Sequence, residues 1–161
     1  MKKILLYFLL AKFLALTGAF LATFLAPVSY KFTQATSFGL KLPYSLWIWA
    51  NFDGGNYLRI ANEGYRPLLY PFFPLFPLSK HFLDEVLKFL GFHIPLLLTG
   101  VLVSNIALFL GLLVLVKVLS FDKQKNLISL ILLVIITYPT SFFYGAVYND
   151  SLFFLLASLT L

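Results

Sequence analysis

The fold of this chain is decided by a 25-residue apolar stretch, PLLLTGVLVSNIALFLGLLVLVKVL, at positions 95–119. Its only charged residue is Lys117, close to its end. About 20 consecutive apolar residues are enough for a helix to cross the hydrocarbon core of a bilayer. The stretch therefore predicts a membrane-spanning helix.

The composition of the whole chain agrees with this prediction. Of its 161 residues, 61% are hydrophobic and 11% are charged, whereas soluble domains are about half apolar and about a quarter charged. The absence of cysteine excludes disulfides, thiolate metal sites and a cysteine nucleophile. The net charge is +6, but the basic residues are scattered, so we expect contact with anionic membrane lipids and no nucleic-acid partner.

A first span is predicted over residues 4–26, with Lys2 and Lys3 before it and Pro27 after it. A signal peptide is the alternative, although its apolar region would be shorter. Lys12 interrupts the span, and a charge at the bilayer centre costs about 3 kcal/mol. The simpler interpretation is that Lys12 snorkels to the cytoplasmic surface; otherwise it faces the bundle interior and meets a lipid phosphate.

Two more apolar runs follow position 119. One predicts a span over residues 127–145 that is broken at Pro139, and the other is a partial span over 151–161, too short to cross a bilayer. Because the chain ends inside that run, we expect a truncated piece of a larger protein, with a short natural end as the alternative. The expected fold is all-α: one membrane domain over residues 1–161, built as a multi-pass transmembrane helical bundle.

Lysines beside the short loops predict the orientation of the bundle. Basic residues concentrate in short loops on the cytoplasmic side. The lysines concerned are Lys2, Lys3, Lys117, Lys123 and Lys125. This predicts a cytoplasmic N-terminus and places the long loop 28–94 and the turn 139–150 together on the external or lumenal face.

The loop 28–94 is too aromatic and too apolar for a disordered segment, and it predicts short helices on the membrane surface. The aromatic residues that suit the interface are Tyr44, Trp47, Trp49, Tyr57, Tyr65 and Tyr70. Prolines at 71, 74 and 77 predict an extended path, which could hold a polyprenyl chain or serve as a rigid connector.

An amphipathic helix is predicted over residues 81–90. Its expected wet face holds Asp84, Glu85 and Lys88. Its expected apolar face is made of Phe82, Leu83, Val86, Leu87 and Leu90. We expect it to lie in the membrane interface, with His81 solvated near its start.

The segment 51–65, NFDGGNYLRIANEGY, contains the first candidate site residue. The glycines 54–55 predict a turn and Gly64 a helix end, so a short helix should follow Asp53. Asp53 is either the N-cap of that helix or a carboxylate that takes a proton from an attacking hydroxyl or holds a metal ion.

A second carboxylate, Asp150, begins the last apolar run on the same predicted face as Asp53. Two carboxylates on one side of a membrane, each at a helix start, can converge on one site. The alternative is helix capping, for which Asn149 or Asp150 followed by Ser151 is well suited.

Together these stretches resemble the PIG-V family, the glycosylphosphatidylinositol mannosyltransferases and their prokaryotic relatives. The resemblance covers roughly residues 47–153. It rests on Asp53, Tyr57-Leu58, Ile60-Ala61, Gly64-Tyr65, Phe72 to Pro77, Pro139, Ser141 to Phe143, and Tyr148 to Phe153. In two departures, Phe52 stands where the family has Trp, and Asp150 stands where it has Glu.

The resemblance implies a GT-C type transferase that passes mannose from a polyprenyl-phosphate donor to a glycolipid, such as a GPI-anchor precursor, or to a protein. Asp53 would be catalytic, and Asp150 would support donor or acceptor. Arg59 would neutralise the lipid phosphate, with an ion pair to Glu63, four residues on, as the plainer alternative. The remaining donor-binding residues would be Tyr57, Tyr65 and Phe73. A divalent cation, if one takes part, would be held by Asp53 or Asp150.

Two other functions stay open. One is a transporter or flippase-like protein for lipid-linked sugars, which ionisable residues facing the inside of the bundle would favour. The other is an inactive membrane fragment. Most charges lie outside the predicted spans, which favours the transferase. The expected location is the cell membrane in a prokaryote or the endoplasmic reticulum membrane in a eukaryote.

Overall fold

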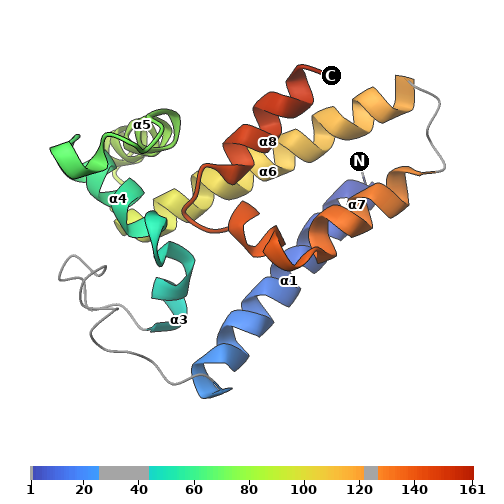
Figure 1. Cartoon of the computed structure of the whole chain (residues 1–161), viewed down its shortest axis with the longest axis horizontal. Coiled ribbons are helices and arrows are strands. Elements are labelled where there is room, and N and C mark those ends of the chain that lie inside the picture. Colours follow the sequence, from blue (N-terminus) through green and yellow to red (C-terminus); the bar gives the residue numbers. More distant parts are fainter. Residues whose placement is uncertain (1, 26–43, 122–126) are drawn as a thin grey trace.

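The computed structural model describes residues 2–25, 44–121 and 127–161, and within them all regular secondary structure is helical (Figure 1). The α-helices are α1 (Lys2–Leu25), α3 (Tyr44–Trp47), α4 (Asp53–Glu63), α5 (Leu75–Phe89), α6 (Leu96–Phe121), α7 (Ile128–Thr137) and α8 (Asp150–Leu159). The 3-10 helices are η1 (Ile48–Ala50), η2 (Pro67–Leu69) and η3 (Pro139–Tyr144). The predicted all-α class is confirmed for these residues. The predicted link at 122–126 and the loop residues 28–43 lie outside them.

Two of the helices are long and apolar enough to cross a membrane: Ile4–Leu25, within α1, and Leu96–Phe121, which is α6. At 1.5 Å per residue, their 22 and 26 residues extend about 33 and 39 Å, against a hydrocarbon core of about 30 Å. They coincide with the first two predicted spans. Because α1 lies near the N-terminus, a signal sequence would meet the same criteria of length and composition.

The third predicted span, 127–145, is divided into two helices. α7 has ten residues and therefore extends only about 15 Å. It ends before Pro139, and the preceding residue, Tyr138, has the extended conformation (φ −60°, ψ 139°) that a following proline favours. After Tyr138 the chain continues as η3 and then turns at residues 145–149 into α8.

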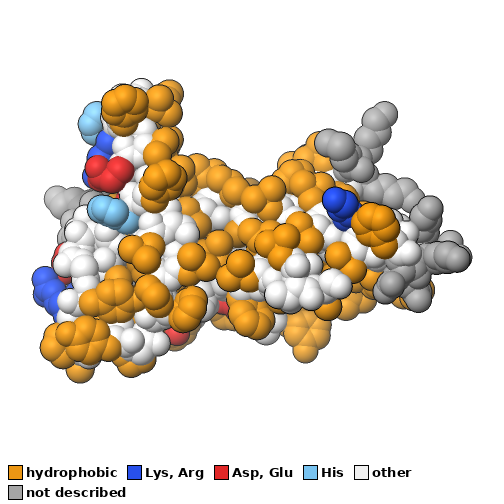
Figure 2. Space-filling view, turned by 90° about the horizontal axis from the view of Figure 1, so that it is seen from above, with side chains coloured by type: hydrophobic (Ala, Val, Ile, Leu, Met, Phe, Trp, Pro, Cys, Tyr) orange, Lys and Arg blue, Asp and Glu red, His pale blue; other side chains and the backbone are white. Residues whose placement is uncertain are grey.

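The helices pack in two pairs, α6 beside α8 and α1 beside α7, with α4 and α5 at one end (Figure 1). One apolar cluster joins α4 and α5 to the first half of α6, through Leu58, Phe76 and Leu97. A second joins α1 to α6 and α7, through Ile4, Leu112 and Leu132. Charged side chains gather at the α4–α5 end, while apolar side chains cover most of the visible surface elsewhere (Figure 2).

The two tryptophans do not lie at the surface, contrary to prediction. Trp47 is 2% exposed and Trp49 is 6% exposed. They are buried because α3 and η1 fold back beside α1, and because the Trp49 ring packs on Phe142 with centroids 4.8 Å apart. Of the other aromatic residues predicted at the interface, Tyr57 is also buried, whereas Tyr65 and Tyr70 are exposed.

α5 begins at Leu75, six residues before the predicted start of the amphipathic helix at 81. The proline stretch is therefore not extended throughout. Pro77 lies in the first turn of α5, where a backbone N–H has no partner within the helix and a proline costs little. His81 is exposed, as predicted, and its Nδ1 also lies 3.1 Å from the Ala61 carbonyl oxygen, which links α5 to α4.

The predicted faces of α5 are right in part: Glu85 and Lys88 are exposed and Leu83 packs on the core as expected, but other residues do not follow the prediction. Asp84, expected in water, is 7% exposed, and Phe82, expected in the apolar face, is 71% exposed. The reason is an ion pair between Asp84 and Lys80, which is fully buried. One turn separates the two residues, so each can compensate the charge of the other inside the molecule.

Candidate functional site

The segment that begins α4 has an unusual backbone. Phe52 has a positive φ of 52°, the single non-glycine residue with one in the described parts of the chain. Such a conformation costs of order 1–3 kcal/mol, and residues held in this way cluster at functional sites. It makes Phe52 the N-cap, so Asp53 is the first residue of α4 and not the predicted cap.

Gly54 and Gly55 lie inside α4 and do not form the predicted turn, whereas Gly64 ends the helix as expected, with φ 79°. A glycine is required at position 54 because there is no room for a side chain. A Cβ at this position would lie 3.0 Å from the carbonyl oxygen of Val147. The absence of a side chain therefore allows the first turn of α4 to touch the turn that leads into α8.

That turn, residues 145–149, is held against η1 by two hydrogen bonds. The Val147 N–H donates to the Trp49 carbonyl at 2.8 Å. The Tyr148 hydroxyl donates to the Asn51 carbonyl at 2.6 Å, across 97 positions of sequence. These bonds carry Tyr148 and Asp150 to the start of α4.

Polar side chains of α6 hold the same turn from the other side. Asn105 donates to the Gly145 carbonyl at 3.2 Å, and Ser104 donates to the Ala146 carbonyl. Irregular backbone among apolar helices needs such partners, because its carbonyl groups are otherwise left without hydrogen bonds. The sequence analysis missed both residues. The sequence could have indicated them, because Ser104 and Asn105 are polar residues inside the apolar stretch 95–119.

In the structure, Asp53 and Asp150 lie close enough to Tyr57 and Tyr148 for their charges to affect both phenols. The pKa of Tyr57 is raised to about 12, first by burial and then by the negative charges of Asp53 and Asp150. Burial and the same two carboxylates also raise the pKa of Tyr148 to about 12. Both tyrosines therefore stay neutral at ordinary pH. The Tyr57 hydroxyl keeps a proton to donate, while the Tyr148 proton is already donated to the Asn51 carbonyl.

Helix capping does not account for Asp150. The N-cap of α8 is Asn149, which makes no side-chain capping hydrogen bond, and Asp150 is the first helical residue. Ser151 uses its hydroxyl to donate to the carbonyl of Tyr144. Each candidate carboxylate is thus the first residue of its own helix, where the helix dipole favours a negative charge.

The other predicted site residues lie around Tyr57. Tyr65 adds a small contribution to the raised pKa of Tyr57, and its own hydroxyl donates to the Phe72 carbonyl at 2.7 Å. The rings that contact Tyr57 belong to Phe72 and Phe76, with centroid distances of 5.2 and 5.3 Å, while the predicted Phe73 is exposed.

Arg59 is half-buried on α4, between the start of the helix and Glu63. The Glu63 carboxylate forms an ion pair with Arg66 at 2.8 Å, a partner that the sequence analysis did not consider. The carboxylate that the plainer alternative pairs with Arg59 is thus bound to Arg66.

The residues that could hold a divalent cation are few. Within the described parts of the chain, no three His, Cys, Asp or Glu side chains gather into a metal site. Asp53 and Asp150 supply carboxylate oxygens, and the buried Oδ1 of Asn51 accepts no hydrogen bond from any described residue. Oxygen atoms are the ligands that Mg²⁺ and Mn²⁺ prefer, but two carboxylates and an amide make an incomplete set. We assign no step to a metal.

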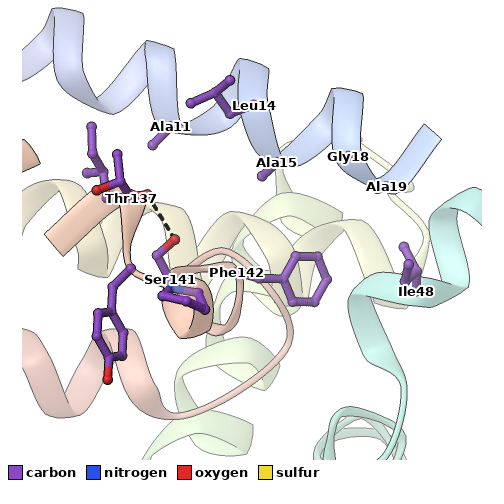
Figure 3. Close-up of a pocket in the computed structure, with 12 residues that line it drawn as sticks. Ala11, Leu14, Ala15, Gly18, Ala19, Ile48, Thr137, Ser141 and Phe142 are labelled. Carbon is purple, nitrogen blue, oxygen red and sulfur yellow. Dashed lines mark hydrogen bonds between the residues drawn. The ribbon is translucent and has the colours of Figure 1, made fainter. Parts of the chain in front are cut away.

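An apolar cavity of about 460 Å³ lies between α1 and the α7–η3 junction (Figure 3). Small residues of α1 line one wall, and Thr137, Ser141 and Phe142 line the other. Ser141 donates to the Ile136 carbonyl at 2.9 Å, so its hydroxyl proton is already used. Ile48, the first residue of η1, also lines the cavity. Asp53 and Asp150 are not among the lining residues.

Lys12 does not snorkel to the helix end, contrary to the simpler interpretation. Its Nζ lies 5.3 Å from the centre of the Phe8 ring, and a Cβ added to Gly145 would lie only 2.5 Å from that nitrogen. The side chain therefore points into the bundle, toward the turn that carries Tyr148.

Comparison with protein-family models, with curated proteins and with solved structures gives no match to this chain.

Proposed function

We propose that this chain belongs to a multi-pass membrane glycosyltransferase of the GT-C type, similar to the PIG-V family. It would transfer mannose from a polyprenyl-phosphate donor to a hydroxyl of a glycolipid or protein. The observation that carries the proposal is geometric: the hydrogen bonds Tyr148–Asn51 and Val147–Trp49 hold the start of α8, with Asp150, beside the start of α4, with Asp53, although 97 residues separate the two carboxylates.

Asp53 is proposed as the catalytic base. The acceptor oxygen forms a bond to the anomeric carbon while the bond from that carbon to the phosphate oxygen breaks. The hydroxyl proton passes to Asp53, and the electron pair of the broken bond leaves with the lipid phosphate. Tyr57 stays neutral, so its hydroxyl can donate a hydrogen bond to a sugar or a phosphate oxygen, whereas the Tyr148 hydroxyl donates to the Asn51 carbonyl and holds the site together. Asp150 would orient a donor or acceptor hydroxyl.

The donor is proposed to lie partly in the cavity between α1 and α7. Its volume of about 460 Å³ falls in the range of roughly 300–1,000 Å³ that is usual for ligand sites, and its lining is apolar, which suits a polyprenyl chain. The phosphate would then meet Arg59, because the planar guanidinium binds phosphate oxygens in pairs. Tyr65 and Phe73 would contact the donor nearer the surface.

In this proposal α1 and α6 cross the membrane, with the N-terminus in the cytoplasm and α4 and α5 on the external or lumenal side. The bilayer would be the cell membrane in a prokaryote or the endoplasmic reticulum membrane in a eukaryote. Anionic lipids would contact the basic residues at the cytoplasmic side.

The test is mannosyl transfer from polyprenyl-phosphate mannose in proteoliposomes that contain the full protein. Asp53→Asn should lower the rate by about 10²–10⁴-fold, the usual contribution of a general base. Glu85→Gln is the matched control, because this exposed carboxylate pairs with Lys88 and is distant in sequence from the site. Equal rates for the Asp53→Asn variant and the unmodified protein would remove Asp53 from catalysis.

A transporter or flippase for lipid-linked sugars is the second candidate, and the inward direction of Lys12 favours it. The two functions are separated by following a fluorescent lipid-linked sugar in the same proteoliposomes. Movement of that lipid between leaflets without any mannosyl transfer would support the transporter. An inactive fragment would do neither.

A further inference from the structure

Lys12 is a charged residue in the middle of an apolar helix. Ten residues separate it from Lys2 at the start of α1, which is about 15 Å along the axis. The ion pairs among the described residues involve Arg66, Lys80 and Lys88, so no described carboxylate pairs with Lys12. Burying an ammonium group in apolar surroundings is costly, and its position therefore calls for a physical reason.

The neighbours of the ammonium group supply that reason. Nζ lies near the face of the Phe8 ring, a favourable cation–π arrangement. It also lies beside Gly145, which is the C-cap of η3. Carbonyl groups at the C-terminal end of a helical turn carry partial negative charge and attract a cation.

Gly145 is small enough to leave room for the Lys12 ammonium group. Its backbone conformation (φ −109°, ψ −13°) is open to any residue, so glycine is not needed for the turn itself. A methyl group here would meet Lys12 Nζ at 2.5 Å and the Trp49 ring at 3.5 Å. The absence of a side chain lets the ammonium group reach the backbone.

The contact occurs just before the residues that form the candidate site. Ala146 and Val147 are fully buried, and Tyr148 follows with its hydroxyl bonded to the Asn51 carbonyl. Asn105 and Ser104 hold the carbonyls of Gly145 and Ala146 from α6. On the α1 side, Lys12 is the charged group that reaches the turn.

We propose that Lys12 is a positioning residue, whose ammonium group fixes Gly145 from the α1 side and thereby sets the place of Tyr148 and Asp150 against α4. This role belongs to the fold and does not depend on glycosyl transfer.

The experiment is hydrogen–deuterium exchange of the full chain in phosphatidylcholine nanodiscs. The reporter is the backbone amide of Val147, which is bonded to the Trp49 carbonyl. Lys12→Met removes the charge and keeps the length of the side chain. It should speed exchange of residues 145–148 by about tenfold, the effect of one helix-end charge interaction, while α6 keeps its protection. Lys12→Arg keeps the charge and should restore most of the protection.

Gly145→Ala provides a second test, because it displaces the ammonium group without removing it. We expect it to speed exchange at 145–148 as Lys12→Met does, and the double variant should show no further increase. The matched controls are Lys117→Met, at the end of α6, and Gly18→Ala, where a Cβ would meet nothing within 4 Å.

Unchanged exchange at 145–148 in both Lys12→Met and Gly145→Ala would overturn the proposal. So would an equal loss of protection in α6, because Lys12 would then support the whole fold and not this turn. Neither readout involves mannose, so failure of the transferase proposal would leave this result standing.

Discussion

Tyr57 and Tyr148 are the residues that join the two halves of the candidate site. Each has a pKa raised to about 12, and in each the charge of Asp53 contributes more than that of Asp150. Phenols in unfolded chains ionise near pH 10. The folded state therefore holds protons that the unfolded state has lost between pH 10 and 12, so its stability must fall as pH rises through this window.

We predict that Asp53→Asn lowers the pKa of both phenols, because it removes the larger of the two nearby negative charges. The measurement is a pH titration by NMR with ring-labelled tyrosine, assigned through Tyr57→Phe and Tyr148→Phe. Asp150→Asn should also lower the pKa of both phenols, but by a smaller amount. Glu63→Gln should leave both values in place. If Asp53→Asn changes neither phenol, the carboxylate does not lie where the structure has it.

A second prediction at the residue scale concerns stability in alkali. The free energy of unfolding should decrease as pH rises above about 10, and the decrease should be smaller in Tyr57→Phe and Tyr148→Phe, which have no phenol to ionise. Chemical denaturation at several pH values measures this. A steeper decrease in either variant would contradict the assigned direction of the pKa shift.

At the scale of elements, α5 shows how a charge pair can occupy the buried side of a helix. The pair Lys80–Asp84 is buried against α4 and α6, and Phe82 is turned outward. Removing one partner of a buried pair leaves an uncompensated charge, which costs about 3–5 kcal/mol, whereas replacing both with apolar residues is often neutral.

We therefore predict that Lys80→Met destabilises the protein by about 3–5 kcal/mol and that Lys80→Met combined with Asp84→Leu recovers most of this loss. Lys88→Met is the control on the same helix. Its pair with Glu85 is exposed, so it should cost less than about 1 kcal/mol. Thermal unfolding in detergent followed by circular dichroism measures all three. A Lys80→Met variant as stable as Lys88→Met would show that the pair is open to water.

At the scale of the whole molecule, the two ends of α6 differ in character. Charged side chains gather around α4 and α5 at one end, and Lys117 lies near the other, about 30 Å along the helix (Figure 2). The proposed membrane orientation requires charged residues at both ends of α6, with the site on the external side and Lys117 on the cytoplasmic side.

The orientation can be tested directly, because the chain has no cysteine of its own. We predict that Glu85→Cys reacts with a membrane-impermeant maleimide in intact cells, whereas Lys117→Cys reacts only after permeabilisation. Both residues are exposed, so labelling reports the side of the membrane and not burial. Equal labelling of the two in intact cells would refute the proposed topology.

The sequence by itself determined the features that depend on neighbouring residues. Continuous apolar runs defined α1 and α6, Pro139 ended α7 because a proline restricts the residue before it, and Gly64 ended α4 through its positive φ. These outcomes need no knowledge of distant contacts, because the length of an apolar run and the backbone preferences of Pro and Gly act locally.

The tertiary structure alone decided where the polar groups point. Asp53 and Asp150 lie close enough for their charges to raise the pKa of the same phenols, because a hydrogen bond joins Tyr148 to Asn51 across 97 positions. Lys12 turns inward because Gly145 leaves room for it, and Asp84 is buried because Lys80 accompanies it. A buried charge is stable only beside a partner, and most of these partners come from elements far apart in the sequence.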